Sequence, residues 1–188
     1  TGSFTGQSAS NIEPRADVKA WSFTPQTWTP QAAVQVSIAR NLANQALKAS
    51  LRDDALGIYR MQMNSELEDR HQRIETEVSF TSSPKRAQEL WQRATAVFDA
   101  LPQQITQQQV DEQRQAFVRA EHVRQQDVTT LQRRLQLSYR HYNDPRYLTD
   151  VATLADSITL QDVRAMAARL FNPNNQVVYI TLPQQVKP

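Results

Sequence analysis

Apolar and polar residues alternate along several short segments of the chain, which is the pattern of β-strands with one buried face. Residues 17–23 (DVKAWSF) alternate charged and apolar side chains before turning aromatic, and residues 74–80 (IETEVSF) alternate throughout. Residues 177–182 (VVYITL) predict a final strand, and residues 4–7 (FTGQ) predict a short first one before a polar turn at residues 8–11.

A β-hairpin is predicted in the middle of the chain. Tyr59, Met61 and Met63 fall on one face of its first strand, with polar residues between them. Residues 67–71 (LEDRH) form a polar turn towards the strand at residues 74–80. This alternation predicts an antiparallel pair with one face exposed to water.

Helical patterns occupy most of the remaining chain. Thr29 followed by Pro30 supplies the N-cap hydroxyl and first-turn proline of a helix that is expected to end near Arg52. An apolar stripe along this helix includes Ile38 and Leu42, and its alanines favour close packing against a sheet.

Further helices are predicted after the hairpin. Thr106-x-x-Gln109 and Thr159-x-x-Asp162 begin two of them as capping boxes, and residues 143–145 (NDP) interrupt the helical region. The predicted fold is an α+β two-layer sandwich, with a mainly antiparallel sheet of about four to five strands packed against a block of helices.

Composition narrows the possible functions. The 188 residues predict a single domain, residues 1–188, and the absence of cysteine excludes disulfides, thiolate zinc sites and cysteine nucleophiles. The 21 Lys and Arg against 19 Asp and Glu give a net charge of only +2, which does not indicate nucleic-acid binding. No apolar run approaches the roughly 18 residues of a membrane span.

Histidines and arginines do not form a recognisable site in the sequence. His71, His122 and His141 are far apart and none belongs to an H-x-x-E-H motif, so we expect three surface histidines and no metal ligand. The arginines between residues 114 and 140 are interspersed with acidic residues, without aromatic residues for base stacking. A solvated helix face is therefore favoured over a nucleic-acid-binding one.

The segment at residues 51–59 (LRDDALGIY) is the most informative. It places Arg52 at a helix end and Tyr59 at the start of a strand, with a tight turn between them. On general grounds Arg52 could simply pair with a neighbouring carboxylate, and Tyr59 could simply fill a core.

This segment resembles the pattern LR-(E/D)-x-L-G-x-x-Y-S of the C-terminal domains of pitrilysin/insulinase-family zinc metallopeptidases. Residues 27–30 (TWTP), 142–145 (YNDP) and 172–175 (NPNN) resemble other family features and occur in the family's order. The resemblance covers about residues 13–184. Because the segment before Glu13 is short for the family, the chain is expected to be a C-terminal-type domain from a longer protease.

The resemblance implies a mechanism divided between two domains. An N-terminal domain, on the same or a partner chain, binds zinc through an inverted H-x-x-E-H motif, whereas this chain binds no metal. The C-terminal domain closes over a peptide or unfolded polypeptide substrate. By position, Tyr59 is implied as a catalytic and substrate-binding residue and Arg52 as a substrate-binding residue. The chain is expected to be inactive alone.

Two interpretations follow from the resemblance. In the first, the chain is the substrate-binding, chamber-closing half of a zinc endopeptidase, with a periplasmic location that agrees with the lack of cysteine. In the second, it is a catalytically inactive structural or interaction domain of the same fold, since the family also contains inactive relatives.

Overall fold

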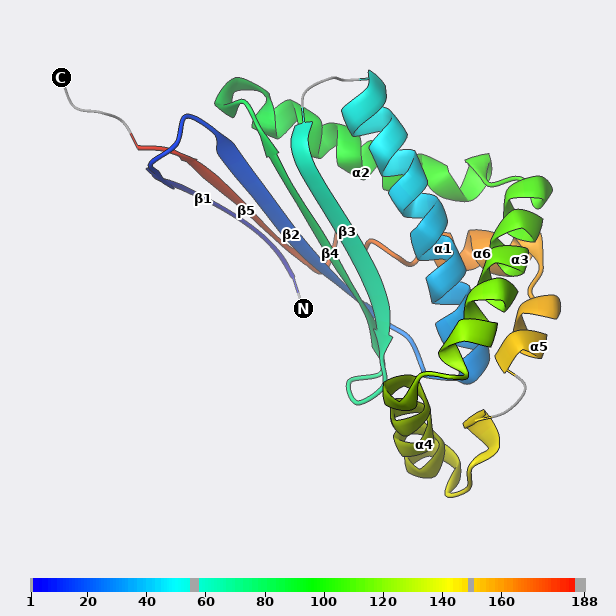
Figure 1. Cartoon of the computed structure of the whole chain (residues 1–188). Helices are drawn as coiled ribbons and strands as arrows, with labels where there is room; N and C mark the ends of the chain where they lie inside the picture. Colours follow the sequence, from blue (N-terminus) through cyan, green and yellow to red (C-terminus); the bar gives the residue numbers. More distant parts are fainter. Residues whose placement is uncertain (1, 55–57, 149–150, 185–188) are drawn as a thin grey trace.

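The computed structural model describes residues 2–54, 58–148 and 151–184, with only the backbone described at residues 52–54. In these ranges a five-stranded sheet carries the helices on one of its faces (Figure 1). The strands are β1 (Ser3–Asn11), β2 (Ala16–Pro25), β3 (Ile58–Glu68), β4 (Arg73–Ser82) and β5 (Gln176–Pro183). The α-helices are α1 (Pro30–Lys48), α2 (Ala87–Gln104), α3 (Gln107–Arg124), α4 (Val128–Tyr142), α5 (Val151–Asp156) and α6 (Leu160–Ala167).

The strand order in the sheet is β1-β5-β2-β4-β3. β1 runs parallel to β5, and the other neighbouring strands are antiparallel. This confirms the predicted α+β fold with a mainly antiparallel sheet. The predicted polar turn at residues 8–11 is wrong, because Ser8 and Ala9 continue β1 by pairing with Thr181 and Leu182 of β5.

Gly6 allows β1 to pass close beneath an aromatic ring of β5. Gly6 is opposite Tyr179 in the parallel ladder. A Cβ atom at Gly6 would lie only 2.8 Å from Cδ2 of the Tyr179 ring. The position therefore favours a residue without a side chain.

The predicted helix caps are confirmed. The Thr29 hydroxyl accepts a hydrogen bond from the Ala32 backbone N–H at 3.0 Å. Thr106 begins α3 and Thr159 begins α6, each with a reciprocal capping box. Because a cap satisfies backbone N–H groups that have no partner inside the helix, these short polar signals set where the helices begin.

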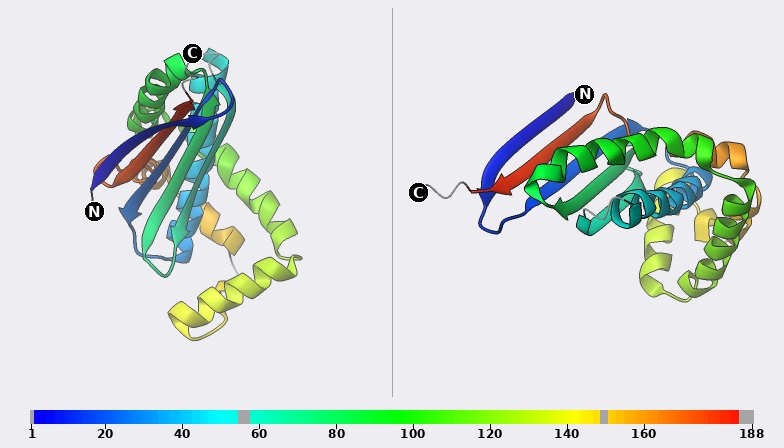
Figure 2. Two further views of the ribbon diagram at one scale, coloured as in Figure 1. Left: turned by 90° about the vertical axis from the view of Figure 1, so that its left-hand side faces the viewer. Right: turned by 90° about the horizontal axis from the view of Figure 1, so that it is seen from above.

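The core lies between the sheet and α1, which also packs on α6. Ile38 and Leu42 of α1 are buried, and so are Val78 of β4 and Ile180 of β5. Ala39 is fully buried, as expected for a helix lying close to its neighbours. The opposite face of the sheet carries no helix in the described ranges, and Figure 2 (left) views that face directly.

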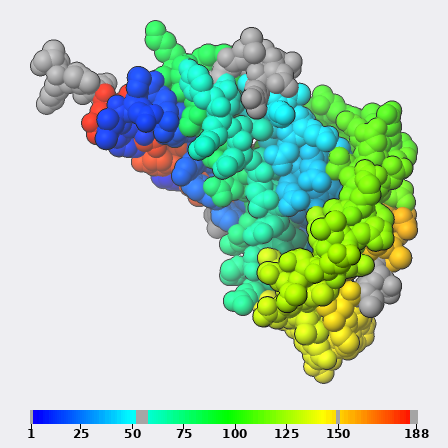
Figure 3. Space-filling model, viewed as in Figure 1, coloured from blue at the N-terminus to red at the C-terminus, as the bar shows by residue number. Residues whose placement is uncertain are grey.

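α4 lies at one end of the molecule, beside the turn that joins β3 to β4 (Figures 1 and 3). The expectation of a surface histidine is wrong for His141, since its ring stacks on Trp28 with 4.3 Å between centroids and 15° between planes. The prediction that the arginines of residues 114–140 lie on a solvated helix face is wrong for Arg134. This residue is 7% exposed and forms an ion pair with Glu121 of α3. No described helix is long and apolar enough to cross a membrane.

Candidate functional site on the open face of the sheet

Tyr59 lies near the start of β3 and is 75% exposed. In the pairing of β3 with β4, Ile58 is opposite Ser82 and Arg60 is opposite Thr81, so Tyr59 is an additional residue in β3. Such a β-bulge redirects a side chain relative to regular alternation. The phenol is therefore not part of the core.

The bulge corrects the predicted face of β3. Ile58, Met61 and Met63 all pack in or against the core, whereas Tyr59 is exposed. The expectation that Tyr59 shares a face with Met61 and Met63 is thus wrong for Tyr59. Alternation of side chains predicts faces only while each residue has one partner on the neighbouring strand.

A cavity of about 510 Å³ adjoins Tyr59 on the open face of β2, β3 and β4. Lys19 and Arg60 line this cavity, and neither has a hydrogen bond or ion pair from its side chain to any other residue in the described ranges. Asp17 also lines it and is already engaged, since Asn11 Nδ2 donates to Asp17 Oδ2 at 2.8 Å. Glu77 also lines the cavity as an exposed carboxylate, so Lys19 and Arg60 lie beside the Tyr59 phenol together with one acidic group. The phenol and the two cations suit a ligand with carbonyl oxygens.

Arg52 belongs to a wide π-type turn, Ala49–Asp54, which follows α1. Leu51 is fully buried in this turn, and the hydroxyl of Ser50 accepts a hydrogen bond from Arg93 Nε of α2 at 2.9 Å. These contacts hold the backbone beside Arg52 against the domain. The Arg52 side chain lies outside the described part of the structure, so its position relative to Tyr59 stays a prediction.

A metal site takes several His, Asp or Glu side chains close together. Over residues 2–54, 58–148 and 151–184, no group of three or more His, Asp or Glu side chains is placed to hold a metal ion. The ring of His141 stacks on Trp28, and His71 Nδ1 lies 3.1 Å from Oε2 of Glu68.

Sequence reasoning missed the basic neighbours of Tyr59. The alternation of residues 17–23 does predict that Lys19 faces away from the core, and this signal was available. That Arg60 lies beside the same cavity depends on the bulge and on the pairing of β3 with β4. Neither feature has a recognisable local sequence signal here.

Solved structures with the same fold include several proteases. The ferredoxin protease FusC, in complex with Arabidopsis ferredoxin, is 68% identical with a TM-score of 0.93, over 98% of this chain and 20% of the FusC chain. The periplasmic protease PqqL from Escherichia coli is 21% identical with a TM-score of 0.85, over 98% of this chain and 21% of PqqL. The inactive peptidase domain of a Bordetella parapertussis protein is 18% identical with a TM-score of 0.71, over 95% of each chain.

Sequence comparison agrees with the structural one. No family model matches the chain. The probable zinc protease PqqL of Escherichia coli K12 is 26% identical over 181 residues, which are 92% of this chain and 19% of PqqL. The chain thus spans about a fifth of the length of FusC and PqqL. The high identity to FusC and the shared fold together confirm the resemblance: the chain is a domain of the pitrilysin/insulinase peptidase family, related to the proteases FusC and PqqL.

Proposed function

We propose that this chain is the substrate-binding, chamber-closing domain of a zinc endopeptidase, and that zinc is held by a separate domain. The observation that carries the proposal is the exposed Tyr59 phenol, which a β-bulge directs away from the core into a cavity that Lys19 and Arg60 also line. The relatives' names support the class of reaction.

The chemistry of Tyr59 suits this role. When water attacks a peptide carbonyl, the carbonyl oxygen becomes an oxyanion, and the Tyr59 hydroxyl would donate a hydrogen bond to it. The Arg52 guanidinium, which is permanently charged, would hold a backbone carbonyl of the substrate. Because these groups lie on a different domain from the metal, cleavage would require the domains to close on the substrate.

Replacing Tyr59→Phe in the full-length enzyme tests the proposal. Loss of one oxyanion donor lowers kcat by about 10²–10³-fold, and we expect a much smaller change in KM. Tyr139→Phe is the matched control, because Tyr139 is a half-exposed tyrosine on α4. Unchanged turnover in Tyr59→Phe would remove Tyr59 from the mechanism.

Arg52 is tested separately with Arg52→Gln and Arg52→Lys. We expect Arg52→Gln to raise KM for peptide substrates, and Arg52→Lys to restore binding only in part, because an ammonium group cannot make the two-point contact of a guanidinium. Equal KM values in the unsubstituted protein, Arg52→Gln and Arg52→Lys would contradict a substrate-binding role for Arg52.

The identity to FusC supports a narrower proposal about substrate and location. FusC is a ferredoxin protease, and we propose a ferredoxin as the polypeptide substrate of the complete protein. PqqL is periplasmic, which supports a periplasmic location. Cleavage of ferredoxin by the full-length protein, compared with cleavage of an unrelated folded protein of similar size, tests the substrate.

A second candidate is a catalytically inactive structural or interaction domain. It is favoured by the similarity to the Bordetella parapertussis inactive peptidase domain, which this chain matches over nearly its whole length. Under this alternative, Tyr59→Phe and Arg52→Gln leave hydrolysis by the full-length protein unchanged, whereas under the first proposal both impair it.

A further inference from the structure

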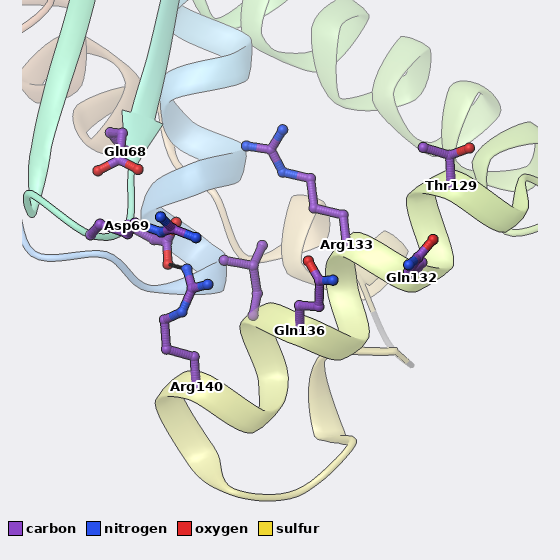
Figure 4. A pocket seen from close by; sticks show the side chains of 9 residues that line it. Glu68, Asp69, Thr129, Gln132, Arg133, Gln136 and Arg140 are labelled. Carbon is purple, nitrogen blue, oxygen red and sulfur yellow. Dashed lines mark hydrogen bonds and ion pairs between the residues drawn. The ribbon is translucent and has the colours of Figure 1, made fainter.

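A polar groove lies between α4 and the turn that joins β3 to β4, at the end of β3 that is farther from Tyr59 (Figure 4). Its volume is about 440 Å³. α4 lines one side with Gln132, Arg133 and Gln136, and the turn lines the other with acidic and basic residues. Leu137 of α4 also lines the groove but is only 9% exposed, so the groove surface is mainly polar.

The two carboxylates of the groove are engaged by the protein itself. Glu68 Oε2 accepts a hydrogen bond from the His71 backbone N–H at 2.7 Å. Asp69 forms an ion pair with Arg140 and lies 3.5 Å from His141 Nε2. The charge of Asp69 is therefore compensated by Arg140, whereas Glu68 is hydrogen-bonded but keeps its negative charge, because a backbone N–H does not neutralise a carboxylate.

Two guanidinium groups of the groove are not engaged in this way. Across the described ranges, the side chains of Arg70 and Arg133 form no hydrogen bond or ion pair. Both residues are exposed, and Arg133 extends from α4 over the groove (Figure 4). The amides of Gln132 and Gln136 add hydrogen-bond donors beside them. The groove thus presents mainly hydrogen-bond donors, and its two unpaired guanidinium groups outnumber the one carboxylate, Glu68, that has no arginine partner among the described residues.

We propose that this groove binds an acidic segment of a polypeptide, with Arg70 and Arg133 as its carboxylate-binding residues. A guanidinium matches the two oxygens of a carboxylate through two parallel hydrogen bonds. The side-chain amides of Gln132 and Gln136 suit the backbone carbonyl groups of a peptide, which a polyphosphate lacks. The expectation of a polypeptide ligand rests on the proposed function, but binding is measurable without hydrolysis.

Fluorescence polarisation with a fluorescein-labelled hexaglutamate peptide tests the proposal on the chain and its variants. We expect Arg133→Gln and Arg70→Gln each to weaken binding by about fivefold, and the double variant to weaken it further. Arg119→Gln is the matched control, because Arg119 is an exposed arginine on α3 that does not line the groove. Affinity for the peptide should fall with added salt, since solvent-exposed charges are screened.

Several results would overturn the proposal. These are no binding of hexaglutamate, equal binding of hexaglutamine, equal affinity in the groove variants and the unsubstituted chain, or an equal loss in Arg119→Gln. Displacement of the peptide by inorganic phosphate at the peptide's own concentration would indicate a simple anion site instead. Peptide binding by Arg133→Gln and turnover by Tyr59→Phe are separate measurements, so either proposal can fail while the other stands.

Discussion

Glu121 of α3 and Arg134 of α4 form a two-point ion pair in the interior of the protein. Arg134 Nη2 donates to Glu121 Oε2 at 2.6 Å, and Arg134 Nη1 donates to Oε1. Glu121 is fully buried and Arg134 is 7% exposed. A buried charge without its partner is strongly destabilising. Each member of the pair therefore depends on the other, and together they join α3 to α4.

Removing one member of this pair should destabilise the protein strongly. Glu121→Leu leaves the Arg134 guanidinium buried without a counter-charge, and we expect the free energy of unfolding to fall by about 3–5 kcal/mol. Urea unfolding followed by circular dichroism measures the change. Glu112→Leu, which removes an exposed carboxylate from the same helix, is the control and should change stability little.

Removing both members should cost less than removing one. Glu121→Leu combined with Arg134→Met replaces the charges with apolar side chains of similar size, so no unpaired charge remains in the interior. The test compares the loss in the free energy of unfolding of the double variant with the losses of Glu121→Leu and Arg134→Met. If the loss of the double variant equals the sum of the two single losses, the pair does not act as a unit.

The stability of the protein should depend on the ionisation of Asp69 at acid pH. Burial acts to raise the pKa of this carboxyl, but the hydrogen bonds and positive charges of Arg140 and His141 outweigh burial and lower the pKa below its ordinary value. The folded pKa is therefore below the unfolded one. The stabilisation is fully present above the unfolded pKa and is lost as the pH falls through the folded pKa.

The Asp69 prediction is tested by urea unfolding over the acid range. The free energy of unfolding should fall less steeply with decreasing pH in Asp69→Asn than in the unsubstituted protein. Arg140→Gln should raise the pKa of Asp69 in an NMR titration of its carboxyl carbon. An acid dependence that is the same with and without the Asp69 carboxylate would contradict the assignment.

The close approach of β1 and β5 at Gly6 predicts that the effect of Gly6→Ala on stability depends on the Tyr179 ring. Gly6→Ala places a methyl group against the Tyr179 ring, and such overpacking typically costs about 1–3 kcal/mol. In a Tyr179→Ala background only Phe4 Cε1, at 3.0 Å, still crowds the new methyl group, so Gly6→Ala should cost much less than in the unsubstituted protein. Unfolding measurements on the four proteins test this, and the same effect of Gly6→Ala in both backgrounds would argue against the ring contact.

Local sequence signals predicted the helices well. Thr29, Thr106 and Thr159 were each identified as N-caps, and the hydroxyl of each accepts a hydrogen bond from the backbone N–H of the residue three positions later. These bonds join residues a few positions apart in the chain. A pattern of such short range can be recognised from the local sequence, without knowledge of the rest of the fold.

Features that depend on two distant segments were predicted poorly. The exposure of Tyr59 arises from a bulge in the pairing of β3 with β4, and the predicted regular alternation put it on the wrong face. His141 appeared to be a surface residue because its contact with Trp28 spans more than a hundred positions of the sequence. Arg134 appeared solvated for a similar reason, since its partner lies on another helix.

The order of amino acids alone determined where strands and helices occur and which face of most of them is apolar, because periodicity and capping act over a few residues. It also determined the family resemblance, which rests on short contiguous motifs in the family's order, chiefly the one around Arg52 and Tyr59. Tertiary structure decided that β1 pairs with β5, that Tyr59 lies beside Lys19 and Arg60, and that α4 and the β3–β4 turn enclose a groove. These arrangements depend on which surfaces bury one another, and burial is a property of the whole folded chain.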